Sequence, residues 1–244
     1  MAMRPIKDII NRSLQALGLP SVETVVSAPD DQTGWQMMGI ANELGDQLFR
    51  AHDWQFLQHD ALFTGDGVIK SFAMPDNFGR MVNQTQWASK NRRPMFGPMT
   101  PQGWSWIQFG IVSVGVYYRY RIVLDRFEVF PTPAAGEEFH FYYISKNWVY
   151  DPVASEIAGS PVFKDQITLD TDVPLFDDAL MQAGCKWKIW AAKGMDATVL
   201  GNEFNFMLDA EKAQTQGAPV IALDSRWEYL YISGQNVPDG SWNV

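Results

Sequence analysis

The sequence predicts an α+β fold in which helices from both ends of the chain form a bundle and an antiparallel β-sheet or barrel is inserted between them. Two patterns predict this fold. Near both ends, apolar residues recur every three or four positions, as on one face of an α-helix, whereas between residues 54 and 150 the period changes to two, as in a β-strand. We therefore divide the chain into a helical module at 1–53 and 172–216, a β domain at 54–150, a linker at 151–171 and an extended C-terminal segment at 217–244.

Residues 172–216 are predicted to form two helices joined by a glycine. The first is expected to begin near Asp172 and Pro174, because proline fits the first helical turn, and to end at Gly194, because glycine suits the left-handed conformation that closes many helices. Asp196 is expected to cap the second helix. Because this hairpin is too apolar to be stable alone, we expect it to pack on helices at the other end of the chain. Its apolar faces consist of Phe176, Leu180, Ala183, Trp187, Trp190, Ala191 and Gly194, then of Val199, Leu200, Phe204, Met207 and Leu208.

Two helices are predicted at the N-terminal end, at residues 4–17 and about 34–52. Gly18 and Pro20 end the first of them. Glycine weakens a helix by about 1 kcal/mol relative to alanine, so we interpret Gly45 as a point of close packing against another helix. The apolar stripes of the two helices are Ile6, Ile9, Ile10, Leu14 and Leu17, and Met37, Ile40, Ala41, Leu44, Leu48 and Ala51.

Five or six strands are predicted between residues 54 and 150. The glycine-flanked Asp66 is expected to form a tight hairpin turn, so that residues 68–73 return beside the strand that precedes the turn. Thr100 followed by Pro101 is typical of a helix N-terminus and predicts a short helix at 101–109. The other predicted strands are 79–88, 112–123 (with Tyr118, Tyr120 and Ile122 on one face and Arg119 and Arg121 on the other), 126–130 and 139–149.

The sequence offers no constellation for catalysis, for a cofactor or for a metal, so we predict none of these and expect a protein that is not an enzyme. His52, His59 and His140 are scattered and lack metal-ligand spacing. Cys185 is the single cysteine, which excludes an internal disulfide, and we interpret it as a buried apolar group.

Charge and hydropathy exclude further classes of protein. The formal net charge is −9 and the isoelectric point is about 4.8, which argues against a protein that grips nucleic-acid phosphates broadly. The sequence contains no run of 18 apolar residues, so it predicts no membrane-spanning helix. The first five residues contain no apolar signal-peptide core, so we expect a soluble, intracellular protein where it is made.

Two groups of side chains are candidates for contacts with partners. Arg92 and Arg93, next to Lys90, can touch DNA or an acidic partner, although charge at a hairpin tip is also common without a function. The segment after residue 216 is too aromatic for a disordered tail, so we expect it to lie on the core or on a neighbouring subunit. Its aromatic residues include Trp227, Tyr229, Tyr231 and Trp242.

Several short sequence segments follow one another in a distinctive order over roughly residues 4–216. They are LGLP (17–20), AHDWQF (51–56), GDG (65–67), MPDNF (74–78), RRPMFGPMTPQGW (92–104), FEVFPTPAAGEEFHFYYISKNWV (127–149) and DTDVPLFDDALMQAGCKWKIWAAKGMD (170–196). This order resembles the head-to-tail adaptors of tailed bacteriophages, of the tail tubular protein A type found in short-tailed phages.

The resemblance implies a structural virion protein made in the host cytoplasm. Such adaptors form an oligomeric ring, commonly a dodecamer, that binds below the portal protein and continues the DNA channel toward the tail nozzle or fibre proteins. This chain departs from the smallest members by a larger β insertion and a longer C-terminal segment, which leaves open the partner of the β domain. Because a wall that bound phosphates would stall the DNA, we expect acidic residues, Glu43 and Asp46, to line the channel.

Two other classes of function stay open at this point. The chain is alternatively a carbohydrate- or protein-binding component of a tail or baseplate, which exposed aromatic residues on a sheet face would favour. An enzyme such as a lysin would need convergent titratable groups in a cleft, and the sequence shows none.

Overall fold

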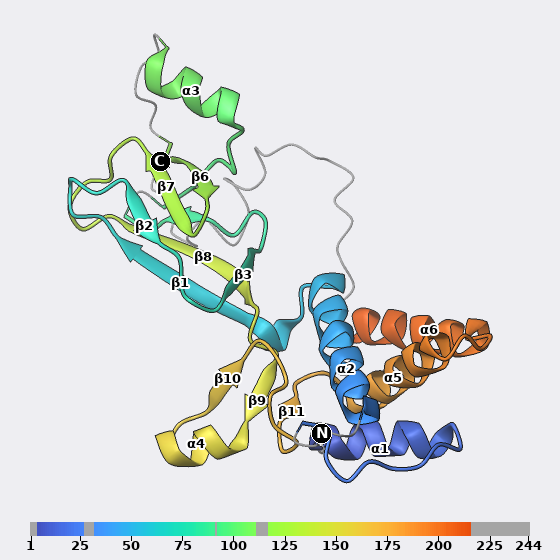
Figure 1. Cartoon of the computed structure of the whole chain (residues 1–244). Coiled ribbons are helices and arrows are strands. Elements are labelled where there is room, and N and C mark those ends of the chain that lie inside the picture. Colours follow the sequence, from blue (N-terminus) through green and yellow to red (C-terminus); the bar gives the residue numbers. More distant parts are fainter. Residues whose placement is uncertain (1–3, 27–31, 91, 111–116, 216–244) are drawn as a thin grey trace, which may run out of the picture.

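We describe residues 4–26, 32–90, 92–110 and 117–215 from a computed structural model (Figure 1). This part of the chain is mixed α+β, with six α-helices and with strands that pair antiparallel in three separate sheets. The predicted mixed α+β class with antiparallel strands is therefore confirmed. Of the two predicted forms of the β domain, a sheet or a barrel, the described residues form sheets and no closed barrel. The strands divide among sheets that face each other across side chains, so no sheet closes on itself.

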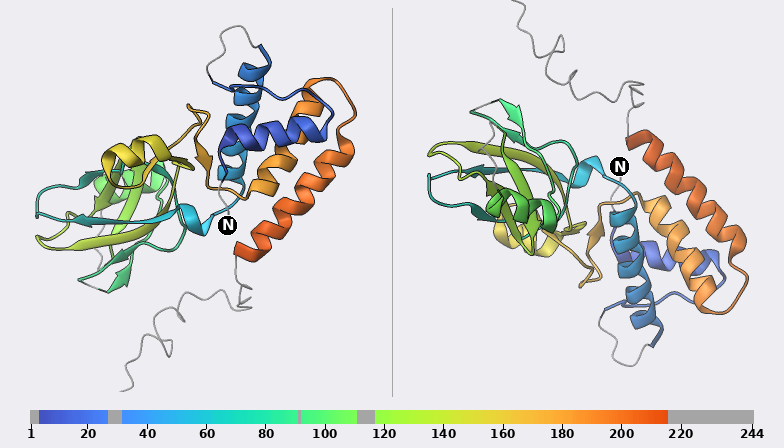
Figure 2. Two further views of the ribbon diagram at one scale, coloured as in Figure 1. Left: turned by 90° about the horizontal axis from the view of Figure 1, so that it is seen from below. Right: turned by 90° about the horizontal axis from the view of Figure 1, so that it is seen from above.

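Four helices come from the two ends of the chain. They are α1 (Ile6–Ala16), α2 (Gln32–Ala51), α5 (Asp178–Ala192) and α6 (Thr198–Thr215). Helix α5 contacts α1, α2 and α6, and Figure 2 shows these segments, distant in sequence, side by side from two directions. The predicted apolar residues of α1 and most of those of α2 are buried in a core that they share with α5.

Glycine positions show where the close contacts of this core lie. A Cβ atom on Gly45 would come within 2.1 Å of the Trp148 ring, so Gly45 packs against a tryptophan that follows β8 and not, as expected, against a helix. The close approach between helices is at Gly184 instead, where a Cβ would meet the Leu44 and Phe204 side chains. The sequence thus predicted correctly that Gly45 packs closely against another part of the chain, but not that its partner is Trp148.

Helix α5 begins later than the sequence predicts. Its N-cap is Asp177, whose carboxylate accepts hydrogen bonds from the backbone N–H groups of Ala179 and Leu180. Pro174 belongs to strand β11, and Asp172 is fully buried before that strand. The competing cap at Asp177 explains the error, because acidic residues suit either position.

The predicted junction between the two helices of this hairpin is confirmed. Gly194 has a φ of +73° directly after the α5 C-cap, and its N–H donates to the Ala191 carbonyl. Asp196 accepts a hydrogen bond from the Thr198 N–H at the start of α6. The predicted faces are only partly buried, since Ala191 and Val199 are exposed.

The β region contains a pair of sheets over one aromatic core. One sheet has the order β1-β8-β4-β5, with β3 also paired to β8, and the other has the order β2-β7-β6. The strands are β1 (Gln58–Thr64), β2 (Ser71–Ala73), β3 (Phe78–Met81), β4 (Trp87–Ala88), β5 (Arg93–Pro94), β6 (Arg119–Val123), β7 (Arg126–Phe130) and β8 (Glu138–Ser145). Stacking of Phe127 on Tyr120 and Phe141 fills the space between the sheets. A 3-10 turn, Gln55–Leu57, precedes β1.

The predicted hairpin at Asp66 does not form. Strand β1 pairs with β8, and β2 pairs with β7 in the other sheet. The Asp66 carboxylate accepts hydrogen bonds from the N–H groups of Val68 and Ile69, so it makes a local turn that sends the chain across to the second sheet. Helix α3 (Pro101–Phe109) and strand β7 have the predicted bounds, and Thr100 caps α3 through the Gly103 N–H.

Residues 151–171, expected to be a linker, contain regular structure. They include α4 (Pro152–Ala158) and β10 (Val162–Lys164), and β9 (Val149–Asp151) pairs with both β10 and β11 (Val173–Pro174). This third sheet lies below the β region and beside α1 and α2 in Figure 1. Short strands and weak periodicity hid it from the sequence pattern.

Candidate functional site

The candidate chemical groups do not converge in the described residues. No three or more His, Cys, Asp and Glu side chains are grouped so that they could hold a metal ion, within the ranges that the structure covers. His52 lies after α2, His59 in β1 and His140 in β8. Burial lowers the pKa of His52, which keeps its ring neutral at pH 7. Cys185 is buried in α5, and burial raises the pKa of its thiol to about 12, so it is not an activated nucleophile.

Glu43 and Asp46, the candidate channel residues, lie about one turn apart on α2 and have different surroundings. Glu43 is exposed, and its carboxylate accepts hydrogen bonds from Lys188 Nζ at 2.8 Å and from Gln47 Nε2 at 3.1 Å. Asp46 is exposed in a groove that also contains Arg50 and Lys146. Each acidic group therefore has a cationic neighbour, on α5 for Glu43 and in the groove for Asp46.

Of the candidate contact residues at the β4–β5 tip, Arg93 lies close to an aromatic ring. Arg92 is exposed with a φ of +47°, and the Arg93 guanidinium carbon lies 5.4 Å from the centre of the Tyr117 ring. This cation–π contact explains Arg93 without a partner. The other contact candidates, Trp227, Tyr229, Tyr231 and Trp242, lie outside the described residues.

No protein-family model matches the chain, and no curated protein matches it in sequence. The adaptor resemblance therefore stays a prediction. No helix among the described residues is long and apolar enough to cross a membrane.

Helices α6 and α3 each expose large apolar side chains, and among them Val199 was predicted to lie on a buried face. On α6, Val199 and Phe206 are each 78% exposed and lie seven residues, or two helical turns, apart on one face. On α3, Trp106 is 61% and Phe109 is 85% exposed, while Trp104 on the opposite face is buried. Such residues are enriched in protein–protein interfaces. Because Trp104 and Trp106 are two residues apart, helical spacing could have predicted that both faces of α3 carry apolar residues.

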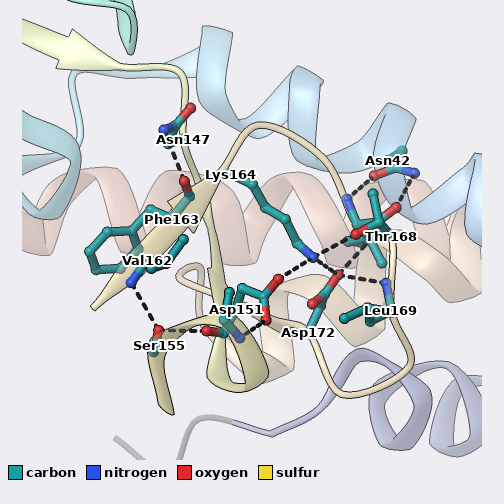
Figure 3. Close-up of polar contacts among 12 residues, drawn as sticks. Asn42, Asn147, Asp151, Ser155, Val162, Phe163, Lys164, Thr168, Leu169 and Asp172 are labelled. Atoms are coloured by element: carbon teal, nitrogen blue, oxygen red, sulfur yellow. Dashed lines mark hydrogen bonds and ion pairs between the residues drawn. The ribbon is translucent and has the colours of Figure 1, made fainter. Parts of the chain in front are cut away.

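A buried polar cluster fastens the third sheet (Figure 3). Lys164 Nζ donates to the carboxylates of Asp172 at 2.7 Å and Asp151 at 3.0 Å, and to Thr168 Oγ1 at 2.6 Å. The Asp172 carboxylate also accepts from the N–H groups of Thr168 and Leu169. Because a buried carboxylate is costly without a partner, Lys164 is a structural cation here rather than a free catalytic group.

The loop after Lys164 also holds the N-terminal helices. The Asn42 side chain of α2 exchanges two hydrogen bonds with the backbone of Ile167. The Asp170 carboxylate accepts from the N–H groups of Val25 and Val26, and the Asp172 carbonyl accepts from the first N–H of α1. Residues 165–172 thereby join the third sheet to both N-terminal helices.

Arg80 of β3 joins the first sheet to the end of α2. Its guanidinium donates to the carbonyls of Phe49 and His52 and to the Asp53 carboxylate, and it lies 5.0 Å from the centre of the Phe49 ring. These carbonyls are in the last turn of α2 or just beyond it, where helical partners are missing. A single side chain thus fixes the position of β3 relative to α2.

Proposed function

We propose that this protein is a subunit of an oligomeric ring, the head-to-tail adaptor between portal and tail nozzle in the neck of a short-tailed phage. In this proposal α1, α2, α5 and α6 form the helical bundle, and the β region is inserted between α2 and α5. The ring, commonly a dodecamer in such phages, continues the DNA channel. The protein is then a structural virion component without enzymatic activity.

The exposed faces of α6 and α3 carry the proposal. A subunit of a ring needs apolar contact surfaces that stay exposed in the isolated chain, because one surface has to meet a different surface of the next copy. Val199 and Phe206 on α6 and Trp106 and Phe109 on α3 have this property. Figure 1 places α6 and α3 at opposite ends of the molecule, so they are two different surfaces, as an interface of this kind requires.

The net charge of −9 also supports a conduit for DNA, since an acidic wall does not retain phosphates. We keep Glu43 and Asp46 of α2 as the proposed channel residues. Lys188 beside Glu43, and Arg50 and Lys146 in the groove with Asp46, reduce the acidic field at these two positions. A continuous basic lining in an assembled ring would contradict this part of the proposal.

The test is assembly on the portal protein of the same phage. The purified chain is mixed with portal rings and viewed by negative-stain electron microscopy, and an added ring of density below the portal is the expected result. Phe206→Glu should abolish the added ring, whereas Asn205→Glu, which puts the same charge on an exposed position about 100° around α6 from Phe206, should leave more of it. Portal rings without added density at saturating chain concentration would reject the proposal.

One observation favours the alternative, a carbohydrate- or protein-binding tail or baseplate component. Leu62 of β1 and Tyr142 of β8 are each about half exposed on the outer face of the first sheet, where cross-strand pairing places them on adjacent rows. Binding to host surface polysaccharide that Tyr142→Ala abolishes, without assembly on the portal, would support this function instead.

A further inference from the structure

A polar groove of about 420 Å³ lies where α2 meets the first sheet and the loop after β10. Asp46 and Arg50 of α2, Lys146 after β8 and Asp165 after β10 line it. We propose that this groove binds an extended polypeptide segment that carries both acidic and basic side chains. Its volume is within the range of about 300–1,000 Å³ that is usual for ligand pockets.

The four charged side chains of the groove form no hydrogen bond or ion pair with the described residues. Elsewhere the same surface pairs its charges: Arg80 binds Asp53, and Lys188 binds Glu43. Asp46 and Arg50 are one helical turn apart, a spacing at which such residues often pair. Two anions and two cations therefore remain available to a ligand in a single concave surface.

This balance of charge selects the ligand class. A nucleic acid or another polyanion would meet Asp46 and Asp165, and a polycation would meet Arg50 and Lys146, so each would gain attraction at two positions and lose it at the other two. The hydroxyl groups of a neutral sugar can hydrogen-bond to these side chains but carry no charge of opposite sign to offset theirs. A segment with alternating acidic and basic side chains pairs with all four.

The walls of the groove are held in place before any ligand binds. The Phe49 ring is fixed between the Arg80 guanidinium and Gly79, where a Cβ atom would come within 2.5 Å of the ring. On the other side, the Asn42 side chain holds the backbone of Ile167, next to Asp165 and Gln166. A preformed groove lowers the entropy that binding costs.

The test uses the intact chain and dye-labelled heptapeptides with blocked ends, made of glycine plus four charged positions. One peptide alternates lysine and glutamate, a second has lysine only and a third has glutamate only. Fluorescence anisotropy at low ionic strength should show the alternating peptide binding about tenfold tighter than either of the others, which corresponds to about 1.4 kcal/mol. Equal affinity for all three, or binding of maltoheptaose in place of the peptides, would overturn the proposal.

Charge-reversed variants separate the groove from general surface charge. Arg50→Glu with Lys146→Glu should shift the preference to the lysine peptide, and Asp46→Lys with Asp165→Lys should shift it to the glutamate peptide. A loss of folding cannot reverse a preference, so this result does not depend on stability. The matched controls Arg12→Glu on α1 and Glu156→Lys on α4 are exposed outside the groove and should keep the preference of the original chain. Controls that change the preference as the groove variants do would refute the assignment.

Peptide binding in the groove does not require the ring. Peptide binding is measured on the isolated chain, so a failure to assemble on the portal leaves it unaffected, and a failure to bind peptides leaves the assembly experiment unaffected.

Discussion

Replacing Gly45 with alanine should destabilise the protein, although the same change in most exposed helices has the opposite effect. Alanine is favoured over glycine in a helix interior by about 1 kcal/mol. At Gly45, however, the new Cβ would lie 2.1 Å from two atoms of the Trp148 ring, about 1.3 Å short of the distance at which ordinary contact begins. Steric cost and helix propensity therefore act in opposite directions at this position.

The steric term should be the larger of the two. Trp148 is 1% exposed, and its ring centre lies 5.8 Å from that of Phe176, so the ring has no free space into which it can move. Overpacking a well-filled core typically costs about 1–3 kcal/mol. Because the overlap is with a buried ring, we take the upper part of this range, about 2–3 kcal/mol. After the gain of about 1 kcal/mol in helix propensity, the net loss is about 1–2 kcal/mol, which lowers the melting temperature by about 2–8 °C for a chain of this size.

Gly39 provides the matched control in the same helix. It is exposed, and nothing lies within 4 Å of a Cβ built there. Gly39→Ala should raise the melting temperature by about 2–4 °C, because only the propensity term remains. Circular dichroism melts and urea titrations of both variants test this difference in sign. A Gly45→Ala protein that melts at or above the temperature of Gly39→Ala would show that α2 and Trp148 do not pack as described.

Three further predictions concern the buried groups. Lys164→Met should cost about 3–5 kcal/mol in urea unfolding, because Asp172 is left buried without its cation, whereas Lys186→Met, which removes an exposed ion pair, should cost less than about 1 kcal/mol. Hydrogen bonds from the Ala154 N–H and from Lys164 lower the pKa of Asp151. The stability that its carboxylate supplies is therefore present above the unfolded pKa of 3.8 and is lost as pH falls through the lower folded pKa. The difference in stability between the original chain and Asp151→Asn should shrink over that range, and a difference that grows on acidification would contradict this prediction. Cys185 should react with a thiol reagent only after unfolding, and rapid labelling of the folded chain would show that it is accessible.

The sequence was most informative where one local pattern decides the structure. Helix α3 has the predicted bounds because a single cap and a proline at N1 define its start. Strand β7 is likewise as predicted, since its alternation places Phe127 and Val129 in the core and Glu128 outside. In both cases no distant partner is needed to make the assignment.

Pairing between distant residues was not predictable in the same way. The glycines around Asp66 are compatible with a hairpin, but whether β1 pairs with β2 or with β8 depends on residues more than 70 positions later. Gly45 posed the same difficulty, because its partner, Trp148, follows β8. The pattern of one sequence indicates that a position must be small, apolar or part of a turn, but not which distant segment it contacts.

The groove was invisible in the sequence for a related reason. Its charged residues come from α2, from the turn after β8 and from the loop after β10, and each is an ordinary exposed charge in its own segment. They meet because Arg80 holds the first sheet against the end of α2, and Asn42 holds the Ile167 loop against the same helix. Helix α2 is thus the element on which the helical, sheet and loop parts are aligned. A change that displaces its last two turns should therefore disturb peptide binding and the attachment of the β region together.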